Sequence, residues 1–224
     1  FMDFPDSIPV MMLPNATLFP HTMLPLFIFE PRYRKMLDYS LASHRLFAVA
    51  LRQENSSQER PHSVAGLGMI RAAVKHEDGT SHIILEGLKR VQLMQATSYR
   101  PYRTHRYQLC KTKRSNEIRI HALREKLVDL IQLREQRSLS NLPSADTPDS
   151  GSSAEEESKS HHLLNNLTEV QDIELLGDLV ASTLISQIHA RQTILSELSL
   201  EKRLNQLVTF LMAESFGRKN KGST

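Results

Sequence analysis

The residues whose types and spacing could do chemistry are scattered along the chain rather than gathered in one motif. Ser199 and Lys202 have the S-x-x-K spacing of serine acyl-enzymes, in which the lysine helps to activate the nucleophile. The S-D-N and K-T-G sequences that accompany this pattern do not occur in the chain. Because Ser199 also begins a stretch with helical apolar periodicity, we interpret it as a helix N-cap.

A thiol nucleophile and a carboxylate acid/base pair have no better support. Cys110 lies five residues after His105, and on a strand an odd separation puts two side chains on opposite faces. Glu86 is the only carboxylate between residues 81 and 94, and the sequence shows no partner for it. We therefore predict that the protein is not an enzyme and has no catalytic residues.

Metal and nucleotide sites are also not predicted. The chain has no H-E-x-x-H sequence, and the adjacent His161 and His162 lie beside a Ser-rich acidic stretch where solvated side chains are expected. The chain contains neither of the Gly-rich sequences that bind phosphates, G-x-x-x-x-G-K-(S/T) and G-x-G-x-x-G. We expect no metal and no cofactor. A single cysteine, no apolar run long enough to span a bilayer and no signal-peptide pattern predict a cytoplasmic protein without a membrane partner.

One basic run of residues could bind a nucleic acid. YRPYRTHRYQLCKTKR, residues 99–114, interleaves arginine with tyrosine, a composition that can contact phosphates and stack on bases. The candidate ligands of RNA or another nucleic acid are Arg100, Arg103, Arg106, Lys111, Lys113 and Arg114. The simpler interpretation is a solvated edge strand whose charges prevent aggregation.

The elements that must position these residues change in type along the chain. Short apolar runs and alternating patterns predict strands at Ile8–Leu13, Met23–Phe29, Leu46–Leu51, Val64–His76, Ser81–Met94 and Tyr99–Lys111. Pro31 begins a helical pattern, and Asp78-Gly79 predicts a type I′ hairpin between two long strands.

Helical periodicity replaces strand patterns in the second half. Stripes of apolar residues follow Ile120, the potential cap Asp172 and Ser199, and Gly217 lies where the last helix should end. Residues 138–160 are rich in Ser and acids and predict a flexible segment. We predict an α+β protein: a β-rich part over 1–115 and a helical part over 116–224.

Three sequence blocks resemble the N-terminal, substrate-binding domain of Lon-type ATP-dependent proteases. The first is IPVMMLPNATLFPHTMLPLFIFEPRYRKML, the second GLGMIRAAVKHEDGTSHIILEGLKRVQLMQ and the third DIELLGDLVASTLISQIHARQTILSELSLEKRLNQLVTFL. The resemblance implies a twisted β-sheet or pseudo-barrel of the PUA-like kind with one helix, followed by a helical bundle. It implies a stand-alone domain, since the ATPase and protease modules of the family do not follow within these 224 residues.

The resemblance also implies a function. We expect a non-catalytic module that binds unfolded or specific polypeptides, and self-association into a homo-oligomer stays open. Four apolar residues around the first apolar strand and helix are the candidate peptide-binding residues: Met23, Phe27, Phe29 and Tyr33. Nucleic acid through the basic run is the alternative partner, because PUA-like folds include RNA-binding members.

Overall fold

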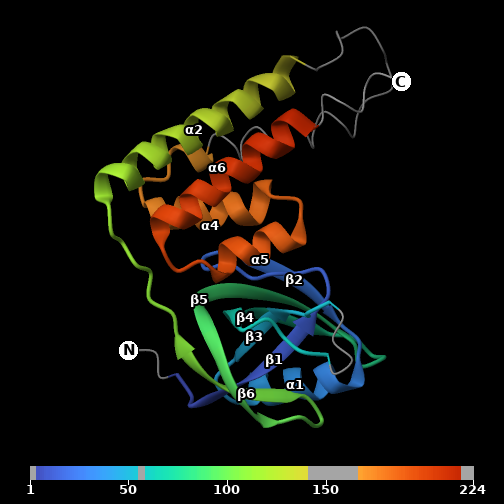
Figure 1. The fold of residues 1–224 in the computed structure, drawn as a ribbon. Helices are drawn as coiled ribbons and strands as arrows, with labels where there is room; N and C mark the ends of the chain where they lie inside the picture. The colour runs from blue at the N-terminus through green and yellow to red at the C-terminus, as the bar shows by residue number, and fades with distance from the viewer. Residues whose placement is uncertain (1–3, 55–58, 141–165, 218–224) are drawn as a thin grey trace, which may run out of the picture. The chain divides into compact units, whose positions relative to one another are not determined.

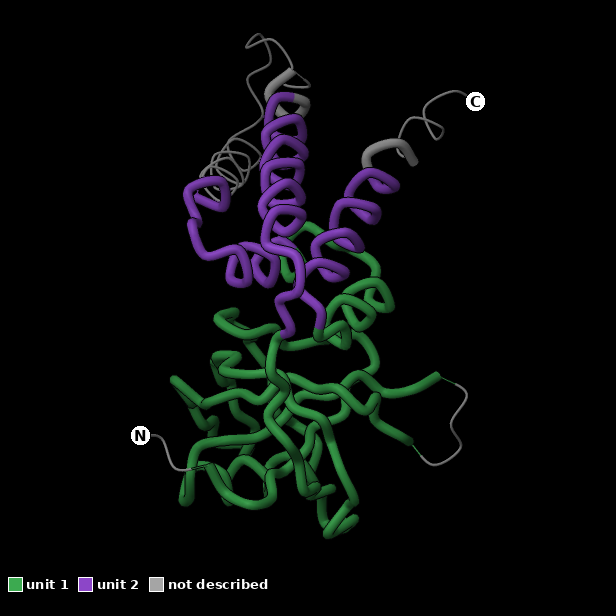
Figure 2. The backbone as a smooth tube through the Cα atoms, turned by 60° about the vertical axis from the view of Figure 1, so that its left-hand side comes forward, with its two compact units in different colours: residues 1–112, 181–198 green, residues 113–180, 199–224 purple. Residues whose placement is uncertain are grey.

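The protein divides into two compact units. The structure is a computed structural model that describes residues 4–54, 59–140 and 166–217. Unit 1 comprises residues 1–112 and 181–198, and unit 2 comprises residues 113–180 and 199–224 (Figure 2).

Helix α1 lies between the second and third strands, and the other described helices follow the last strand (Figure 1). The strands are β1 (Ser7–Leu13), β2 (Met23–Ile28), β3 (Leu46–Leu51), β4 (Val64–Lys75), β5 (Ser81–Ser98) and β6 (Arg103–Leu109). The helices are α1 (Pro31–Ala42), α2 (Glu117–Ser140), α4 (Ile173–Leu184), α5 (Ile188–Ser196) and α6 (Leu200–Gly217). The α+β class and the predicted strands are confirmed, with β5 running four residues beyond its expected end at Met94.

The sheet of unit 1 closes on itself. Its strand order is β2-β5-β4-β3-β1-β6, and β6 also pairs with β5. Five strands therefore form a barrel, and β2 lies outside this closed ring against the first half of β5, as predicted for a pseudo-barrel. Only β1 and β3 pair in parallel, and the chain between them passes through β2 and α1, as a parallel pair requires.

Strands β1 and β3 are buried on both faces. Phe47 and Val49 of β3 pack with Met36 of α1 in one apolar cluster. Ala48 and Ala50, the alternate residues of β3, belong to a second cluster on the opposite side of the strand. Burial on both faces explains why β1 and β3 read as continuous apolar runs instead of alternating patterns.

The segment between β1 and β2 packs tightly onto the sheet. Leu18 and Phe19 are fully buried. A Cβ atom on Gly66 of β4 would overlap the carbonyl oxygen of Leu18, and one on Gly87 of β5 would overlap that of Phe19. Glycine at these two positions lets the crossing backbone reach the strands.

The β4–β5 hairpin differs from its prediction. Gly79 has a φ of 79°, whereas Asp78 does not adopt a positive φ, so the expected type I′ turn is wrong. Gly79 N–H donates to His76 O, and His76 N–H donates to Thr80 O, both at 2.9 Å. This is a three-residue loop, a type I turn followed by a left-handed glycine. Asp78 closes it by accepting hydrogen bonds from the Thr80 backbone and hydroxyl.

Helix α5 belongs with the barrel. Arg90 of β5 donates to Leu195 O at 3.1 Å, and Gln192 donates to Val64 O at 3.0 Å. Residues 181–198 accordingly belong to unit 1, a return of the chain that the predicted division at 115 and 116 does not include. Sequence periodicity could not show this, because a helix pattern does not specify its partner.

Unit 2 is helical and is organised around a buried arginine. Arg203 of α6 is fully buried and pairs with Asp178 at 3.5 Å and with Glu174 at 3.3 Å, both on α4. The predicted cap Asp172 accepts hydrogen bonds from the backbone N–H groups of Glu174 and Leu175. α6 ends at Gly217 as expected.

The acidic stretch is described only at its start. α2 continues through residues 138–140, so the predicted flexible segment does not begin at residue 138. The remainder of 138–160 lies outside the described residues, as do His161 and His162.

Candidate functional site

An apolar surface covers the outer side of three neighbouring strands of unit 1. Met23 and Phe27 of β2, Ile84 of β5 and Val74 of β4 all lie on it, 59%, 48%, 37% and 60% exposed respectively. Register places Pro25 opposite Ile84, and Val74 opposite His82 beside it. We call this surface the outer face. Contiguous exposed apolar residues of this kind mark interaction sites more often than stray surface contacts.

The outer face follows from strict alternation. In β2 the residues 24, 26 and 28 point toward the core, and 23, 25 and 27 point outward. In β5 Ser81, Ile83 and Leu85 are buried while His82 and Ile84 are exposed. A strand with a single buried face shows this period of two, so apolar residues on its other face need a separate reason.

The free side of β2 can accept another strand. Among the described residues, β2 has one strand neighbour, β5. Gly87 N–H donates to Thr22 O at 2.8 Å, so Thr22 directs its carbonyl toward β5. Because alternate residues direct their backbone groups to opposite sides, those of Met23, Pro25 and Phe27 point away from β5. Pro25 has no backbone N–H, which is tolerated here because this side of β2 is a strand edge.

Aromatic rings cluster at one end of this face. The Phe27 ring lies 4.7 Å from the His82 ring and 5.9 Å from that of Phe29, centroid to centroid. His76 Nε2 and His82 Nδ1 are 2.7 Å apart, so one imidazole donates its N–H to the other. Phe29 is 58% exposed, directly after β2. The cluster presents two apolar phenylalanine rings beside two polar imidazoles, and aromatic residues are enriched at protein interfaces.

An ion pair borders the apolar residues. Arg71 of β4 pairs with Glu86 of β5, which stands opposite Met23 in the register. A polar rim around an apolar centre is the usual composition of a protein-binding surface.

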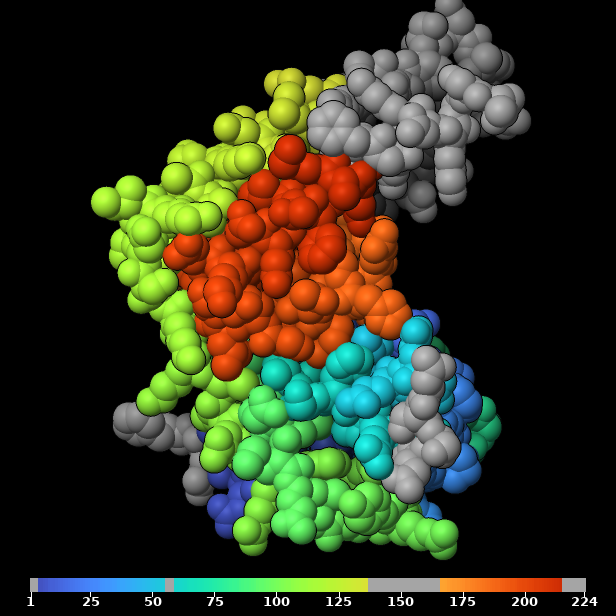
Figure 3. Space-filling view, viewed as in Figure 1, coloured from blue at the N-terminus to red at the C-terminus, as the bar shows by residue number. Residues whose placement is uncertain are grey.

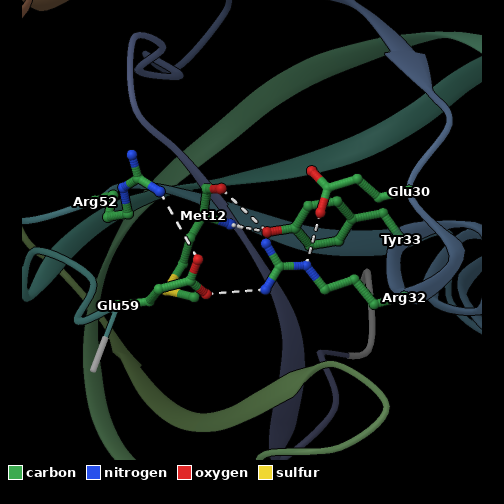
Figure 4. A network of polar contacts seen from close by, with 6 residues as sticks. All are labelled: Met12, Glu30, Arg32, Tyr33, Arg52 and Glu59. Atoms are coloured by element: carbon green, nitrogen blue, oxygen red, sulfur yellow. Dashed lines mark hydrogen bonds and ion pairs between the residues drawn. The ribbon is translucent and has the colours of Figure 1, made fainter. Parts of the chain in front are cut away.

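Tyr33, a predicted peptide-binding residue, is not part of this surface because its side chain is buried. Only 5% of the side chain is exposed. Its hydroxyl accepts a hydrogen bond from Met12 N–H at 3.1 Å and donates one to Met12 O at 3.0 Å (Figure 4). β6 pairs with β1 only as far as Val10, so Tyr33 satisfies backbone groups beyond that strand. Burial, the largest influence, raises the pKa of Tyr33.

A polar network beside Tyr33 holds the start of α1. Arg32 donates to Glu30 and to Glu59, both at 2.9 Å, and Arg52 lies 3.7 Å from Glu59 (Figure 4). The hydrogen bond from Arg32 lowers the pKa of Glu59. The network therefore links α1 to the connection between β3 and β4.

The structure gives the nucleic-acid alternative no support. Arg103 and Arg106 lie three residues apart on β6 and hence on opposite faces. Lys113 and Arg114 belong to unit 2, whereas Arg100 and Lys111, like Arg103 and Arg106, belong to unit 1. Arg114 is held by Glu117 at 2.9 Å. No single face within either unit gathers the six cations.

The remaining chemical candidates have structural roles. Burial raises the pKa of the Cys110 thiol, which disfavours the reactive thiolate. Lys202 N–H lies 3.5 Å from Ser199 Oγ, and Arg203 N–H donates to Ser199 O at the start of α6, as expected of an N-cap. Within the described ranges no three metal-ligating side chains gather. In the same ranges no helix is both long and apolar enough to cross a membrane.

A family model described as the ATP-dependent protease La (LON) substrate-binding domain matches residues 7–213. The chain belongs to this family. The match includes the barrel, α5 and most of the helical unit, so the LON substrate-binding domain accounts for both units.

Known proteins agree with this assignment. The Lon protease of Dictyoglomus thermophilum is 19% identical over 215 residues, which are 95% of this chain and 25% of that protein. Lon protease 2 of Herpetosiphon aurantiacus is 27% identical over 219 residues, 93% of this chain and 24% of that protein. The chain thus spans about a quarter of the length of these relatives.

Solved structures share the fold. The N-terminal domain of Lon protease from the Mycobacterium avium complex aligns with a TM-score of 0.69 at 17% identity, covering 92% of this chain and 98% of that one. A Lon N-terminal domain protein from Xanthomonas campestris aligns with a TM-score of 0.57 at 17% identity, covering 91% and 98%.

Sequence analysis found only part of the outer face. Met23, Phe27 and Phe29 are exposed, whereas Tyr33 is not. Ile84 and Val74 were missed. The alternation SHIILEG contained a signal, because its buried set Ser81, Ile83, Leu85 leaves Ile84 facing outward.

Proposed function

We propose that this LON substrate-binding domain binds polypeptide segments that expose apolar residues, and that the outer face receives them. The observation that carries the proposal is the exposed apolar surface across β2, β5 and β4 in a domain whose family is described as substrate-binding. An exposed surface of this composition, next to an unpaired strand edge, is suited to an extended chain.

The binding mode follows from the strand geometry. A segment added to the free side of β2 would bond to the backbone groups of Met23, Pro25 and Phe27. Its alternate side chains would lie over the same face as Phe27 and Ile84. Backbone bonding does not depend on sequence, so this mode suits a module that accepts many unfolded segments.

The proposed module holds polypeptide without transforming it. The thiol of Cys110 is disfavoured as a thiolate, and Ser199 begins a helix. Both observations support a binding role for the matched domain.

The contribution of the outer face to binding affinity can be estimated from Phe27. Full burial of a phenylalanine side chain contributes about 2–3 kcal/mol. Since 48% of Phe27 is still exposed, covering it adds about 1 kcal/mol, or roughly fivefold in affinity. Phe27→Ser should therefore weaken binding about fivefold, and Phe27→Ser with Ile84→Ser should weaken it by ~10-fold or more.

The test measures binding of reduced, carboxymethylated lactalbumin by isothermal titration calorimetry. The matched control is Leu109→Ser, which removes a 45% exposed apolar residue of β6 outside the outer face. The proposal expects dissociation constants of about 10–100 µM that change little with salt, weakened by the Phe27 variants and not by the control. Equal loss in both variants, or no binding in this range by the unaltered protein, refutes it.

A further inference from the structure

A pocket of about 690 Å³ lies in unit 1 away from the outer face. It is an open pocket, lined by residues 53 and 60–63 on one side and by six residues between 93 and 105 on the other. The β5–β6 ladder is irregular at this point, with register shifts between Leu93 and Ala96 and between Ala96 and Ser98. Figure 3 shows both chain segments, cyan near residue 60 and green near residue 100, on the viewed face of unit 1. Bulges of this kind often lie beside functional sites.

Backbone hydrogen bonds fix the walls of this pocket. Leu93 N–H donates to Ser63 O at 2.7 Å, and His62 N–H donates to Leu51 O at 2.8 Å. The Gln53 side chain donates to Pro61 O at 3.0 Å. The pocket is therefore largely formed in advance, as ligand sites usually are.

Two guanidinium groups give the pocket its charge. Arg60 and Arg103 line it, and none of its lining residues is acidic. The Arg103 guanidinium lies over the Tyr99 ring, 5.1 Å from its centroid, a cation–π contact that favours this position. Burial, followed by the influence of His189, lowers the pKa of His62, which disfavours the charged form of this imidazole. The positive charge comes from the two arginines.

The pocket also has an apolar wall and a buried imidazole. Pro61, Leu93 and Met94 supply apolar surface. His105 is 7% exposed, and its Nδ1 lies 2.9 Å from Met94 O. With the proton on Nδ1, Nε2 is an acceptor, and it has no hydrogen-bond partner among the described residues. A buried imidazole in this state favours a donor in the pocket.

We propose that this pocket binds the C-terminal residue of a polypeptide, with Arg60 and Arg103 on its carboxylate and Leu93, Met94 and Pro61 around an apolar side chain. The last residue of a chain offers the three matching groups together: a planar anion for guanidinium, an apolar side chain and an amide N–H donor for His105. The site is independent of the outer face and of the function proposed for it.

A phosphate fits this pocket less well than a carboxylate does. Phosphates are usually held by backbone N–H groups at helix starts or glycine turns, and no helix start and no glycine lines the pocket. A guanidinium fork can bind either anion in a bidentate manner, so the preference for a carboxylate comes from the apolar part of the wall, which suits the side chain of a terminal residue.

The test uses an N-terminally fluorescein-labelled peptide, Gly-Ser-Gly-Ala-Leu, as free acid and as C-terminal amide, with binding followed by anisotropy. The free acid should bind with a dissociation constant below about 1 mM, and the amide at least ~10-fold more weakly. Arg103→Gln should weaken the free acid about 10-fold, and Arg60→Gln similarly. The control Arg106→Gln removes the same charge from an exposed position on β6 outside the pocket, and it should change affinity less than about twofold.

Thermal unfolding and circular dichroism establish that each variant is folded. Phe27→Ser should leave peptide binding unchanged, which separates this site from the outer face. Equal affinity for acid and amide, equal loss in Arg103→Gln and Arg106→Gln, or displacement of the peptide by an equal concentration of inorganic phosphate overturns the proposal. Competition by N-acetyl-leucine but not by its amide supports the same carboxylate site.

Discussion

Replacing Tyr33 by phenylalanine separates a structural role from a binding role. The ring of Tyr33 stays buried in Tyr33→Phe, but the hydroxyl that bonds to both backbone groups of Met12 is lost. Met12 is itself 6% exposed, so solvent cannot easily replace that hydroxyl. The substitution tests whether the domain depends on this contact to complete β1 where β6 ends.

The expected cost follows from the two bonds. An intramolecular hydrogen bond contributes about 1 kcal/mol net, and a buried polar group left without a partner costs about 1–3 kcal/mol. Two backbone groups of Met12 lose their partner, so the free energy of unfolding should fall by about 2–3 kcal/mol. For a chain of this length that is a fall in Tm of roughly 5–10 °C.

Urea denaturation followed by far-UV circular dichroism gives the free energy, and amide hydrogen exchange gives a local reading at Met12. Tyr39→Phe in the same helix is the matched control, because Tyr39 is 54% exposed and its loss of hydroxyl should cost less than about 0.5 kcal/mol. Unchanged unfolding in Tyr33→Phe, together with weaker polypeptide binding, would refute the structural role and return Tyr33 to the binding surface.

Three further substitutions test other parts of the account. Arg203→Met leaves buried carboxylate without its cation and should cost about 3–5 kcal/mol in urea denaturation; a loss below about 1 kcal/mol would contradict the buried pair. Glu59→Gln should cost less than about 1 kcal/mol at pH 7, because Glu59 is 43% exposed. Because its folded pKa is lowered, that stabilisation is present above the ordinary value of 4.5 and disappears as the pH falls through the folded pKa, so wild type and variant should converge in acid melts. Gly87→Ala should lower the free energy of unfolding by about 1–3 kcal/mol, because its Cβ would overlap the Phe19 carbonyl; an unchanged urea midpoint would show that the backbone can yield.

Local sequence patterns were sufficient to predict most of the strands and helices. Apolar runs marked β1 and β3, Pro31 marked the start of α1, and Asp172 capped α4 as its position suggested. The hairpin at Gly79 was located correctly but assigned the wrong turn, since the dipeptide Asp-Gly is compatible with more than one loop length. The placement of residues 181–198 in unit 1 depends on long-range hydrogen bonds that no local pattern encodes.

The site was harder to predict than the fold. Apolar side chains such as Phe27 and Tyr33 look alike in sequence, and only the structure shows that one is exposed and the other bonded to Met12. The pocket beside Arg103 is formed by two segments that lie far apart in the sequence and by irregular pairing between β5 and β6. Neither feature has a sequence signature.

The most direct test of the outer face is a methyl NMR titration of the full chain with reduced, carboxymethylated lactalbumin. With ¹³C-labelled methionine and isoleucine methyl groups, Met23 and Ile84 report on the face, while Met36 and Ile70 report on the buried core. We predict saturable shifts at Met23 and Ile84 and none at Met36 or Ile70. Unchanged Met23 and Ile84 signals under conditions where the polypeptide binds would contradict the account.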